Sequence, residues 1–180
     1  LGLMVERRSE GLRIGPNENK LGQRASPTNE LTFDRVRVSA DQLIGYRGHG
    51  QVNALETLSV GRGGLVSGCS TLADRLLHDY VDVWRREPQL YALAQAEQER
   101  IATLSARLVG LMDRADLTQG DFRIEAALSK YLATEGLHRI LKWFETLYGP
   151  GAAARELPIE KWRRDIRVLN IYEGTNEVQR

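Results

Sequence analysis

The sequence has little that would support a disulfide, a membrane span or a nucleic-acid interface. Cys69 is the only cysteine among the 180 residues, so an intrachain disulfide is excluded and the composition fits a reducing compartment. No run of about 18 apolar residues is present to predict a membrane span, and no secretory-signal pattern is present at the start. A net charge of +1 predicts no DNA or RNA partner, because nucleic-acid-binding surfaces usually carry a clustered basic excess.

Motifs for several common chemistries are also missing. The three histidines, His49, His78 and His138, are scattered, with no second metal ligand of a repeated kind at a spacing of three or four residues, so no metal site is predicted. There is no Gly-x-Ser-x-Gly elbow and no phosphate-loop lysine. The segment Gly48-His49-Gly50 lacks the third glycine of a dinucleotide fingerprint, and we interpret it as a turn.

Two kinds of pattern divide the chain. Short apolar segments broken by turn residues fill residues 1–46, with a strand predicted over residues 30–38 whose alternation slips between Phe33 and Val36, as at a bulge or bend. Residues 47–180 show helical periodicity instead. Because the chain opens in an apparent strand and closes where a helix should begin, we expect both ends to be cut. The prediction is the end of a β-domain at 1–46, followed by a helical domain at 47–180 that is truncated at its end.

Apolar residues recurring at intervals of three and four predict long helices from about residue 48 to 87, from 88 to 115 and from 121 to 148, with a shorter one from Pro158. Thr118 is a predicted capping residue for the third. Long helices with short connections indicate an antiparallel up-down bundle, so the predicted fold class is mainly α, and α+β overall. The residues assigned to the inward face of the third helix are Ile124, Leu128, Tyr131, Leu137, Leu141 and Phe144.

Glycines interrupt the first of these helices. Each costs about 1 kcal/mol relative to alanine inside a helix, so a cluster predicts that another backbone or a ligand comes very close. The cluster consists of Gly61, Gly63, Gly64 and Gly68.

Glu173 lies between an aromatic residue and a glycine, in a predicted sharp turn. With Ile171 and Tyr172 on one side and Gly174 on the other, its carboxyl could be desolvated, which would raise its pKa toward the range useful for proton abstraction. The alternative is an exposed turn glutamate, and the local sequence alone favours that alternative.

Two stretches near the end of the chain form a long ordered signature: Pro158-Ile159-Glu160-Lys161-Trp162-Arg163-Arg164-Asp165, and Ile171-Tyr172-Glu173-Gly174-Thr175-Asn176-Glu177-Val178-Gln179-Arg180. Together they closely resemble the C-terminal signature of the acyl-CoA dehydrogenases. Weaker similarity continues upstream at residues 20–22, 27–31, 33, 36, 45, 48–50 and 60–62. The resemblance covers nearly the whole chain, at high density only near its end.

The resemblance implies an enzyme that uses FAD to oxidise an acyl-CoA thioester to its trans-2-enoyl product. Glu173 would remove the α-proton while the β-hydrogen leaves as hydride to the flavin. Tyr172 and Gly174 would line the acyl pocket, and Arg62 would lie near the CoA side. Some family members place the base immediately before the arginine that matches Arg62, a position that is Gly61 here.

The resemblance also implies cofactor contacts. Thr175 would reach the FAD pyrophosphate, with further contacts from Glu177, Glu145, Gly149 and Gly151. Two segments depart from the family pattern: Arg85-Arg86-Glu87-Pro88-Gln89-Leu90-Tyr91 has no Phe-Gly, and Glu145 occupies a usual glutamine position. These departures leave room for a subunit without catalysis, or a half-site partner in a hetero-oligomer.

Several properties of the parent protein follow from the same resemblance. We expect a homodimer or homotetramer, an electron-transfer flavoprotein as electron acceptor, and a cytoplasmic (bacterial) or mitochondrial-matrix location. A flavin oxidase on the same fold is a further alternative. The supplied chain alone is expected to bind FAD weakly or not at all, and to be inactive.

Overall fold

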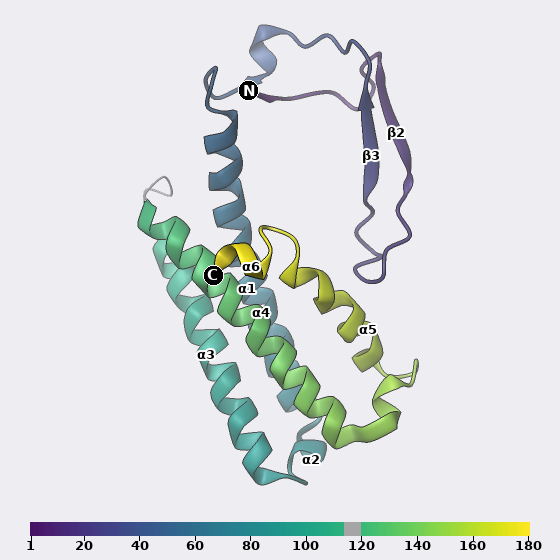
Figure 1. Cartoon of the computed structure of the whole chain (residues 1–180), viewed down its shortest axis with the longest axis vertical. Helices are drawn as coiled ribbons and strands as arrows, with labels where there is room; N and C mark the ends of the chain where they lie inside the picture. Colours follow the sequence, from purple (N-terminus) through teal and green to yellow (C-terminus); the bar gives the residue numbers. More distant parts are fainter. Residues whose placement is uncertain (114–119) are drawn as a thin grey trace. The chain divides into compact units, whose positions relative to one another are not determined.

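The computed structural model describes residues 1–113 and 120–180 (Figure 1). The predicted capping residue Thr118 lies outside the described residues. The chain divides into two compact units, Leu1–Thr57 and Leu58–Arg180, and helix α1 spans the division. The prediction of a mainly helical fold with a small β part is confirmed.

The N-terminal unit contains two small antiparallel sheets. Strand β1 (Gly2–Leu3) pairs with β4 (Leu43–Ile44), β2 (Leu12–Asn17) pairs with β3 (Asn29–Phe33), and the short 3-10 helix η1 covers Ala40–Gln42.

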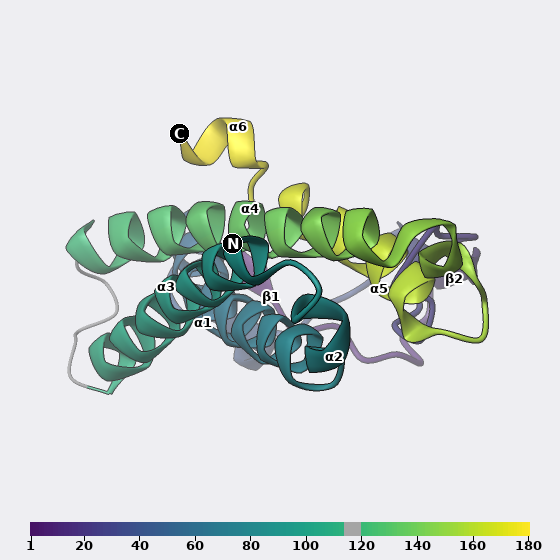
Figure 2. The same cartoon turned by 90° about the horizontal axis from the view of Figure 1, so that it is seen from below.

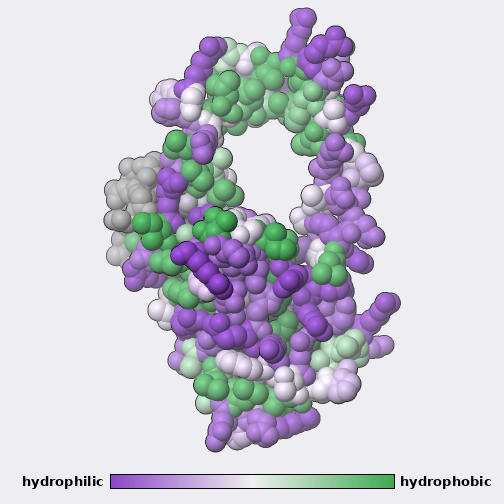
Figure 3. All heavy atoms as spheres, in the orientation of Figure 1, coloured by the Kyte–Doolittle hydropathy of each residue, from purple (hydrophilic) through white to green (hydrophobic). Residues whose placement is uncertain are grey.

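The strand predicted over residues 30–38 is shorter than expected. It ends at Phe33, because Arg35 adopts a left-handed backbone with φ of 51° that turns the chain. None of residues 1–57, all of which the structure describes, is buried. Apolar atoms therefore appear on the surface of this unit (Figure 3).

The second unit is a helical bundle whose long helices run alternately down and up in Figure 1. Its elements are α1 (Gly50–His78), α2 (Val81–Trp84), α3 (Pro88–Met112), α4 (Gly120–Tyr148), η2 (Gly149–Ala153), α5 (Pro158–Ile166), η3 (Arg167–Asn170) and α6 (Asn176–Gln179). The predicted up-down bundle is confirmed. In Figure 2, α4 lies between α6 on one side and α1 and α3 on the other.

The first long helix ends earlier than predicted, at His78 instead of near Glu87. The chain leaves helical geometry at Tyr80, where φ is −122° and ψ is 28°. Trp84 then folds back, and its indole Nε1 donates a hydrogen bond of 2.8 Å to the Leu76 carbonyl. Burial of this large side chain favours the break over helix continuation, because a buried Trp needs a partner for its N–H.

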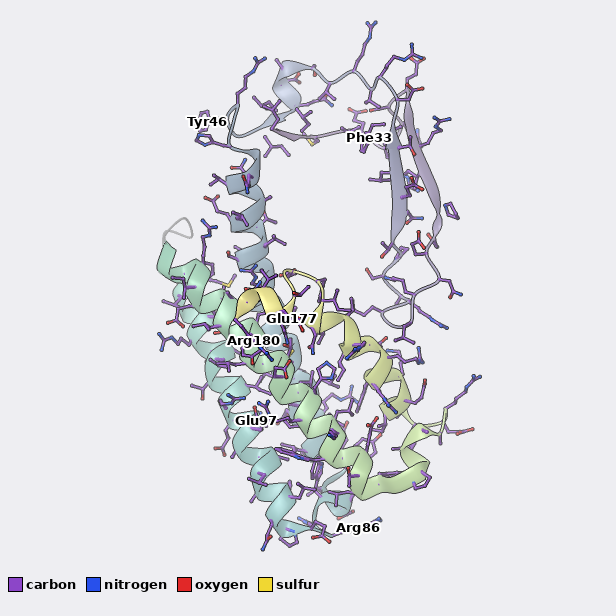
Figure 4. All side chains as sticks on the ribbon, in the orientation of Figure 1. Phe33, Tyr46, Arg86, Glu97, Glu177 and Arg180 are labelled. Carbon is purple, nitrogen blue, oxygen red and sulfur yellow. The ribbon has the colours of Figure 1, made fainter. Side chains whose placement is uncertain are left out.

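Aromatic side chains form the centre of the core at one end of the bundle. Trp84 and Phe144 are fully buried, with ring centroids 5.6 Å apart, and Tyr80 meets Phe144 edge to face at 5.0 Å. Glu97, labelled in Figure 4, joins α3 to α4, because Arg139 donates to its Oε1 at 2.9 Å. These contacts fix α4 as the central element of the unit.

The inward face of α4 differs from the prediction in its first half. Ile124 and Leu128 are 61% and 45% exposed. The buried face instead begins with Phe122, passes through small residues and one lysine at intervals of three and four, and continues into large apolar residues: Phe122, Ala126, Lys130, Ala133, Leu137, Ile140 and Phe144.

Candidate active site

A strained turn presents Glu173 between η3 and α6. Glu173 and Gly174 both have left-handed backbones, with φ of 57° and 91°. Glycine adopts this region freely, whereas a non-glycine residue there costs on the order of 1–3 kcal/mol. The surrounding contacts must therefore hold Glu173 in place.

Arg62 of α1 supplies one of these contacts. Its Nε and Nη2 donate to the Glu173 carbonyl at 3.1 and 3.0 Å. The side chain is largely removed from solvent, at 9% exposure, and burial lowers the pKa of Arg62 while the Glu173 charge raises it. Two of its N–H groups are thus committed to the turn itself.

Lys130 of α4 supplies the next contact. Its Nζ donates to the Gly174 carbonyl at 2.9 Å and to Asn176 Oδ1 at 2.7 Å. The Asn176 amide in turn donates to Thr134 Oγ1 at 3.0 Å and to Glu135 Oε1 at 2.8 Å. Two consecutive carbonyls of the turn are therefore held by cations from two different helices.

The Glu173 carboxyl lies against α1 at Gly61. A Cβ added to Gly61 would lie 2.6 Å from Glu173 Oε1 and 2.9 Å from Oε2. Oε2 is buried and has no hydrogen-bond partner among the described residues. Burial raises the pKa of Glu173 above its ordinary value, and the nearby charges of Arg62 and Lys130 act in the opposite direction. An unpaired, desolvated carboxylate oxygen is suited to accept a proton.

The source of this desolvation differs from the prediction. Ile171 and Tyr172 are 56% and 38% exposed, so they are not buried around the carboxyl. The carboxyl instead lies closely against the backbone of α1 at Gly61. Gly63 of the glycine cluster is also closely approached, because an added Cβ there would lie 2.7 Å from Met112 Sδ. An added Cβ at Gly64 or Gly68 would have nothing within 4 Å.

Residues after the turn start α6. Thr175 is its N-cap, and its Oγ1 accepts from the Val178 N–H at 3.3 Å. The same hydroxyl also hydrogen-bonds the Glu177 carboxyl, which helps to lower the pKa of Glu177. Glu177 on α6 and Arg180 directly after it are exposed (Figure 4), and Arg180 Nε donates to the Tyr131 hydroxyl of α4 at 3.1 Å.

The other predicted cofactor residues lie toward the opposite end of α4. Lys130 and Glu145 are separated by roughly 22 Å along the helix, at 1.5 Å per residue. Glu145 Oε1 lies 3.6 Å from Arg163 Nε of α5. Gly149 has φ of 73° and nothing within 4 Å of an added Cβ, whereas Gly151 packs against the Tyr148 ring. The structure therefore brings Arg62, Glu173, Gly174 and Thr175 together, without Glu145, Gly149 and Gly151.

Sequence reasoning missed Lys130, Thr134, Glu135 and Asn176. The signal was available for Lys130, because it continues backward the same helical face that ends in Phe144. Its charge argued against an inward position, since lysine is almost never fully buried unless paired.

Other features of the molecule lie elsewhere or provide no site. Two surface hollows lie against β2 and β3 in the N-terminal unit, the larger lined by Gly11, Arg13 and Asp34 among others. Within residues 1–113 and 120–180, no group of three or more acidic, His or Cys side chains could hold a metal ion. No helix in the same ranges is long and apolar enough to cross a membrane. Cys69 is buried, which raises the pKa of its thiol to about 12.

Comparison with known proteins places these observations in a family context. The family model described as "Acyl-CoA dehydrogenase, C-terminal domain" matches residues 48–180. Bovine very long-chain specific acyl-CoA dehydrogenase, a mitochondrial protein, is 32% identical over 98% of this chain and 28% of its own length. The rat short/branched chain specific enzyme is 34% identical over 98% of this chain and 43% of its own. The chain thus spans less than half the length of these relatives.

Solved structures share the fold over nearly the whole chain. Butyryl-CoA dehydrogenase from Megasphaera elsdenii has a TM-score of 0.88 at 26% identity, covering 98% of this chain and 49% of that one. An acyl-CoA dehydrogenase from Bacillus anthracis, solved with FAD, has a TM-score of 0.87 at 24% identity, covering 98% and 35%. The second likeness supports the fold alone.

Proposed function

The chain belongs to the acyl-CoA dehydrogenase family, and on this premise we propose that it carries the catalytic base of an FAD-dependent enzyme that oxidises acyl-CoA to trans-2-enoyl-CoA. Glu173 is the proposed base. One observation carries the proposal: Glu173 is held in a left-handed turn by two cations, while its own Oε2 remains buried and unpaired.

The chemistry asked of Glu173 is removal of the proton α to a thioester carbonyl. This proton is weakly acidic until hydrogen bonds polarise the carbonyl, and we assign one of those bonds to the backbone N–H of Glu173. Arg62 and Lys130 fix the backbone on which both groups are mounted. FAD, when bound, supplies the acceptor for the β-hydrogen and its electron pair. Tyr172 and Gly174 line the acyl pocket in this proposal.

The residues beside Glu173 fit a flavin cofactor in two respects. The unpaired Glu173 oxygen suits a site completed by further groups, and the Thr175 hydroxyl, which hydrogen-bonds the Glu177 carboxyl, can exchange that acceptor for an anionic oxygen such as that of the pyrophosphate. Glu177 lies exposed on the same short helix. We propose that these residues hold one part of the cofactor.

Glu145, Gly149 and Gly151 are assigned to a cofactor held by a neighbouring subunit, because they lie toward the far end of α4. A homodimer or homotetramer follows from this assignment. The two departures from the family pattern have local roles compatible with catalysis: Glu145 pairs with Arg163, and Pro88 occupies the first turn of α3, where its missing N–H is harmless.

The proposal concerns the whole protein to which this chain belongs. The chain covers less than half of the length of the relatives that it matches. Acyl-CoA is the proposed substrate and an electron-transfer flavoprotein the proposed electron acceptor. The relatives are mitochondrial and bacterial proteins, so the matrix or the cytoplasm is the proposed location. The isolated 180 residues are expected to bind FAD weakly and to be inactive.

The test is anaerobic mixing of the purified full-length protein with acyl-CoA substrates of several chain lengths, followed by flavin absorbance. We expect rapid bleaching by at least one substrate. Glu173→Gln should slow bleaching by roughly 10²- to 10⁴-fold, the usual contribution of a general base, with FAD content unchanged. Glu99→Gln, an exposed glutamate on α3, is the matched control and should behave like the wild type.

This experiment, together with the FAD content of the purified protein and an aerobic turnover assay, separates the alternatives. Bleaching by no acyl-CoA would overturn the proposal, and a homo-oligomer purified without stoichiometric FAD would favour a partner subunit that lacks catalysis. Rapid oxygen consumption during turnover would assign the protein as an oxidase.

A further inference from the structure

Lys130 is a cation without solvent and without a carboxylate in direct contact. Its side chain is 0% exposed, and the groups that accept its hydrogen bonds in the described structure are the Gly174 carbonyl and the neutral amide oxygen of Asn176. Burial is the largest influence that lowers its pKa, ahead of Arg62. A buried charge of this kind is costly unless something is gained from it.

We propose that Lys130 is a positioning residue for Glu173: it holds the backbone after the base through the Gly174 carbonyl, and its positive charge favours the ionised form of the carboxyl. The inference rests on the proposed function and deepens it, because it concerns how the base is oriented and kept ionised. Lys130 touches no reacting atom in this role.

The geometry favours this role over simple packing. Lys130 lies on the buried face of α4, where its neighbours one turn away in each direction are Ala126 and Ala133 or Thr134. Small side chains at these positions leave room for the extended lysine to reach across to the turn. Its Nζ joins the residue after the base to Asn176, the first residue of α6. One amine therefore links three elements: α4, the turn and α6.

Other charged groups face this site from each packed element. Arg62 of α1 lowers the pKa of Lys130, and Cys69 of α1, Glu173 of the turn and Glu177 of α6 raise it, in that order of influence. Glu135 of α4 lies one hydrogen bond further away, through Asn176. For Glu173, the two opposing cations are Arg62 and Lys130. Removal of Lys130 leaves Arg62 as the one remaining cation of this pair.

Loss of the Lys130 charge should raise the pKa of Glu173 further, because a nearby positive charge favours the ionised carboxylate. The acid limb of flavin reduction would move to higher pH. A residue that only packed the bundle would lower stability without moving that limb.

The experiment compares Lys130→Met with wild type in the FAD-loaded full-length protein. The rate of flavin reduction by acyl-CoA is measured against pH, and the Glu173 carboxyl is titrated by ¹³C NMR in protein with labelled glutamate, assigned with Glu173→Gln. Lys142→Met is the matched control, because Lys142 is an exposed lysine three turns further along α4.

We expect Lys130→Met to slow flavin reduction by roughly 100-fold, as for a misplaced catalytic group, and to shift the acid limb and the Glu173 titration upward by about 1 pH unit. Lys142→Met should change neither. A folded, FAD-containing Lys130→Met protein whose rate or acid limb equals that of the wild type would overturn the inference. An unreactive wild type would instead refute the proposed function.

A second variant keeps the inference testable if Lys130→Met does not fold. Asn176→Ala removes one of the two acceptors of Lys130 but leaves the charge in place. It should slow flavin reduction by about tenfold through looser positioning, with the acid limb unmoved. An unchanged rate in folded Asn176→Ala protein would contradict the role of Lys130 in holding the turn.

Discussion

The two ends of α4 use charge in opposite ways. Near its beginning, Lys130 is fully buried and contacts the turn that carries Glu173. Near its end, Glu145 meets Arg163 at 3.6 Å, with the Arg163 side chain 69% exposed. The Lys130 charge is desolvated, so it needs every hydrogen bond that it makes. The Glu145–Arg163 pair is screened by water.

The same helix thus carries a buried candidate site around Lys130 and an ordinary surface ion pair at Glu145. At the first end, small residues and glycine bring backbone and charge close together, and the base gains an unpaired oxygen. At the second end, an ion pair between the half-buried Glu145 and the exposed Arg163 joins α4 to α5, and a glycine with φ of 73° follows the helix. Substitutions at the two ends should therefore differ in both size and kind of effect.

The largest expected effect is that of pH on the Glu173 end. In the proposed mechanism the ionised Glu173 carboxylate is the active form, and burial raises the pKa of Glu173 above its ordinary value. The rate of flavin reduction should fall about tenfold per pH unit below that raised pKa and level off above it. Stopped-flow rates over a pH series check this, and an acid limb at or below the pKa of a free glutamate would contradict the desolvation.

Gly61→Ala tests the same end of α4 by changing only the position of the Glu173 carboxyl, without changing a charge. The new methyl would lie 2.6 Å from Glu173 Oε1, so the flexible carboxyl must move while the helix itself gains about 1 kcal/mol of propensity. We expect flavin reduction to slow by roughly 10- to 100-fold, with thermal stability unchanged or higher.

Gly64→Ala is the matched control, because an added Cβ at Gly64 on the same helix has nothing within 4 Å. It should raise stability by a similar amount without loss of rate. Equal rates for the two alanine variants would show that Gly61 does not leave space for the base.

Arg163→Ala tests the opposite end and should have the smallest effect. Removing an exposed ion pair costs about 0–1 kcal/mol, so the free energy of unfolding measured in urea should change within that range. The shift should shrink further at high salt, because exposed pairs are screened. A loss of several kcal/mol would mean that the Glu145–Arg163 contact is a structural anchor and would remove the contrast between the two ends.

Much of the helical architecture could be predicted from the sequence. Periodic apolar residues located α3 and α4, and Pro88 marked the start of α3, because these signals are local. The end of α1 could not be predicted, since Trp84 folds back onto Leu76 through a hydrogen bond and packing with residues distant in sequence. Apolar character also misled at Ile124 and Leu128, which are exposed, while Lys130 on the adjacent face is buried.

The sequence supplies a candidate base, which stays a prediction, but the contacts that hold that residue in place could not be predicted. The motif around Glu173 pointed to the residue, and Gly61 marked the position that faces it. The two cations that hold the turn come from residues 111 and 44 positions away in the chain, and no local pattern records such contacts. A long-range hydrogen bond to a backbone carbonyl depends on where the chain folds, and any side chain with a suitable donor could make it.

Exchange of the α-hydrogen in D₂O tests the central claim most directly, because it isolates proton removal from the redox step. The probe is an acyl-CoA analogue with sulfur in place of the β-carbon, which has no β-hydrogen to transfer as hydride. We predict that the wild-type, FAD-loaded protein exchanges the α-hydrogens for deuterium, as followed by NMR, and that Glu173→Gln binds the analogue without exchange. Exchange by Glu173→Gln at the wild-type rate would contradict the assignment of Glu173 as the base.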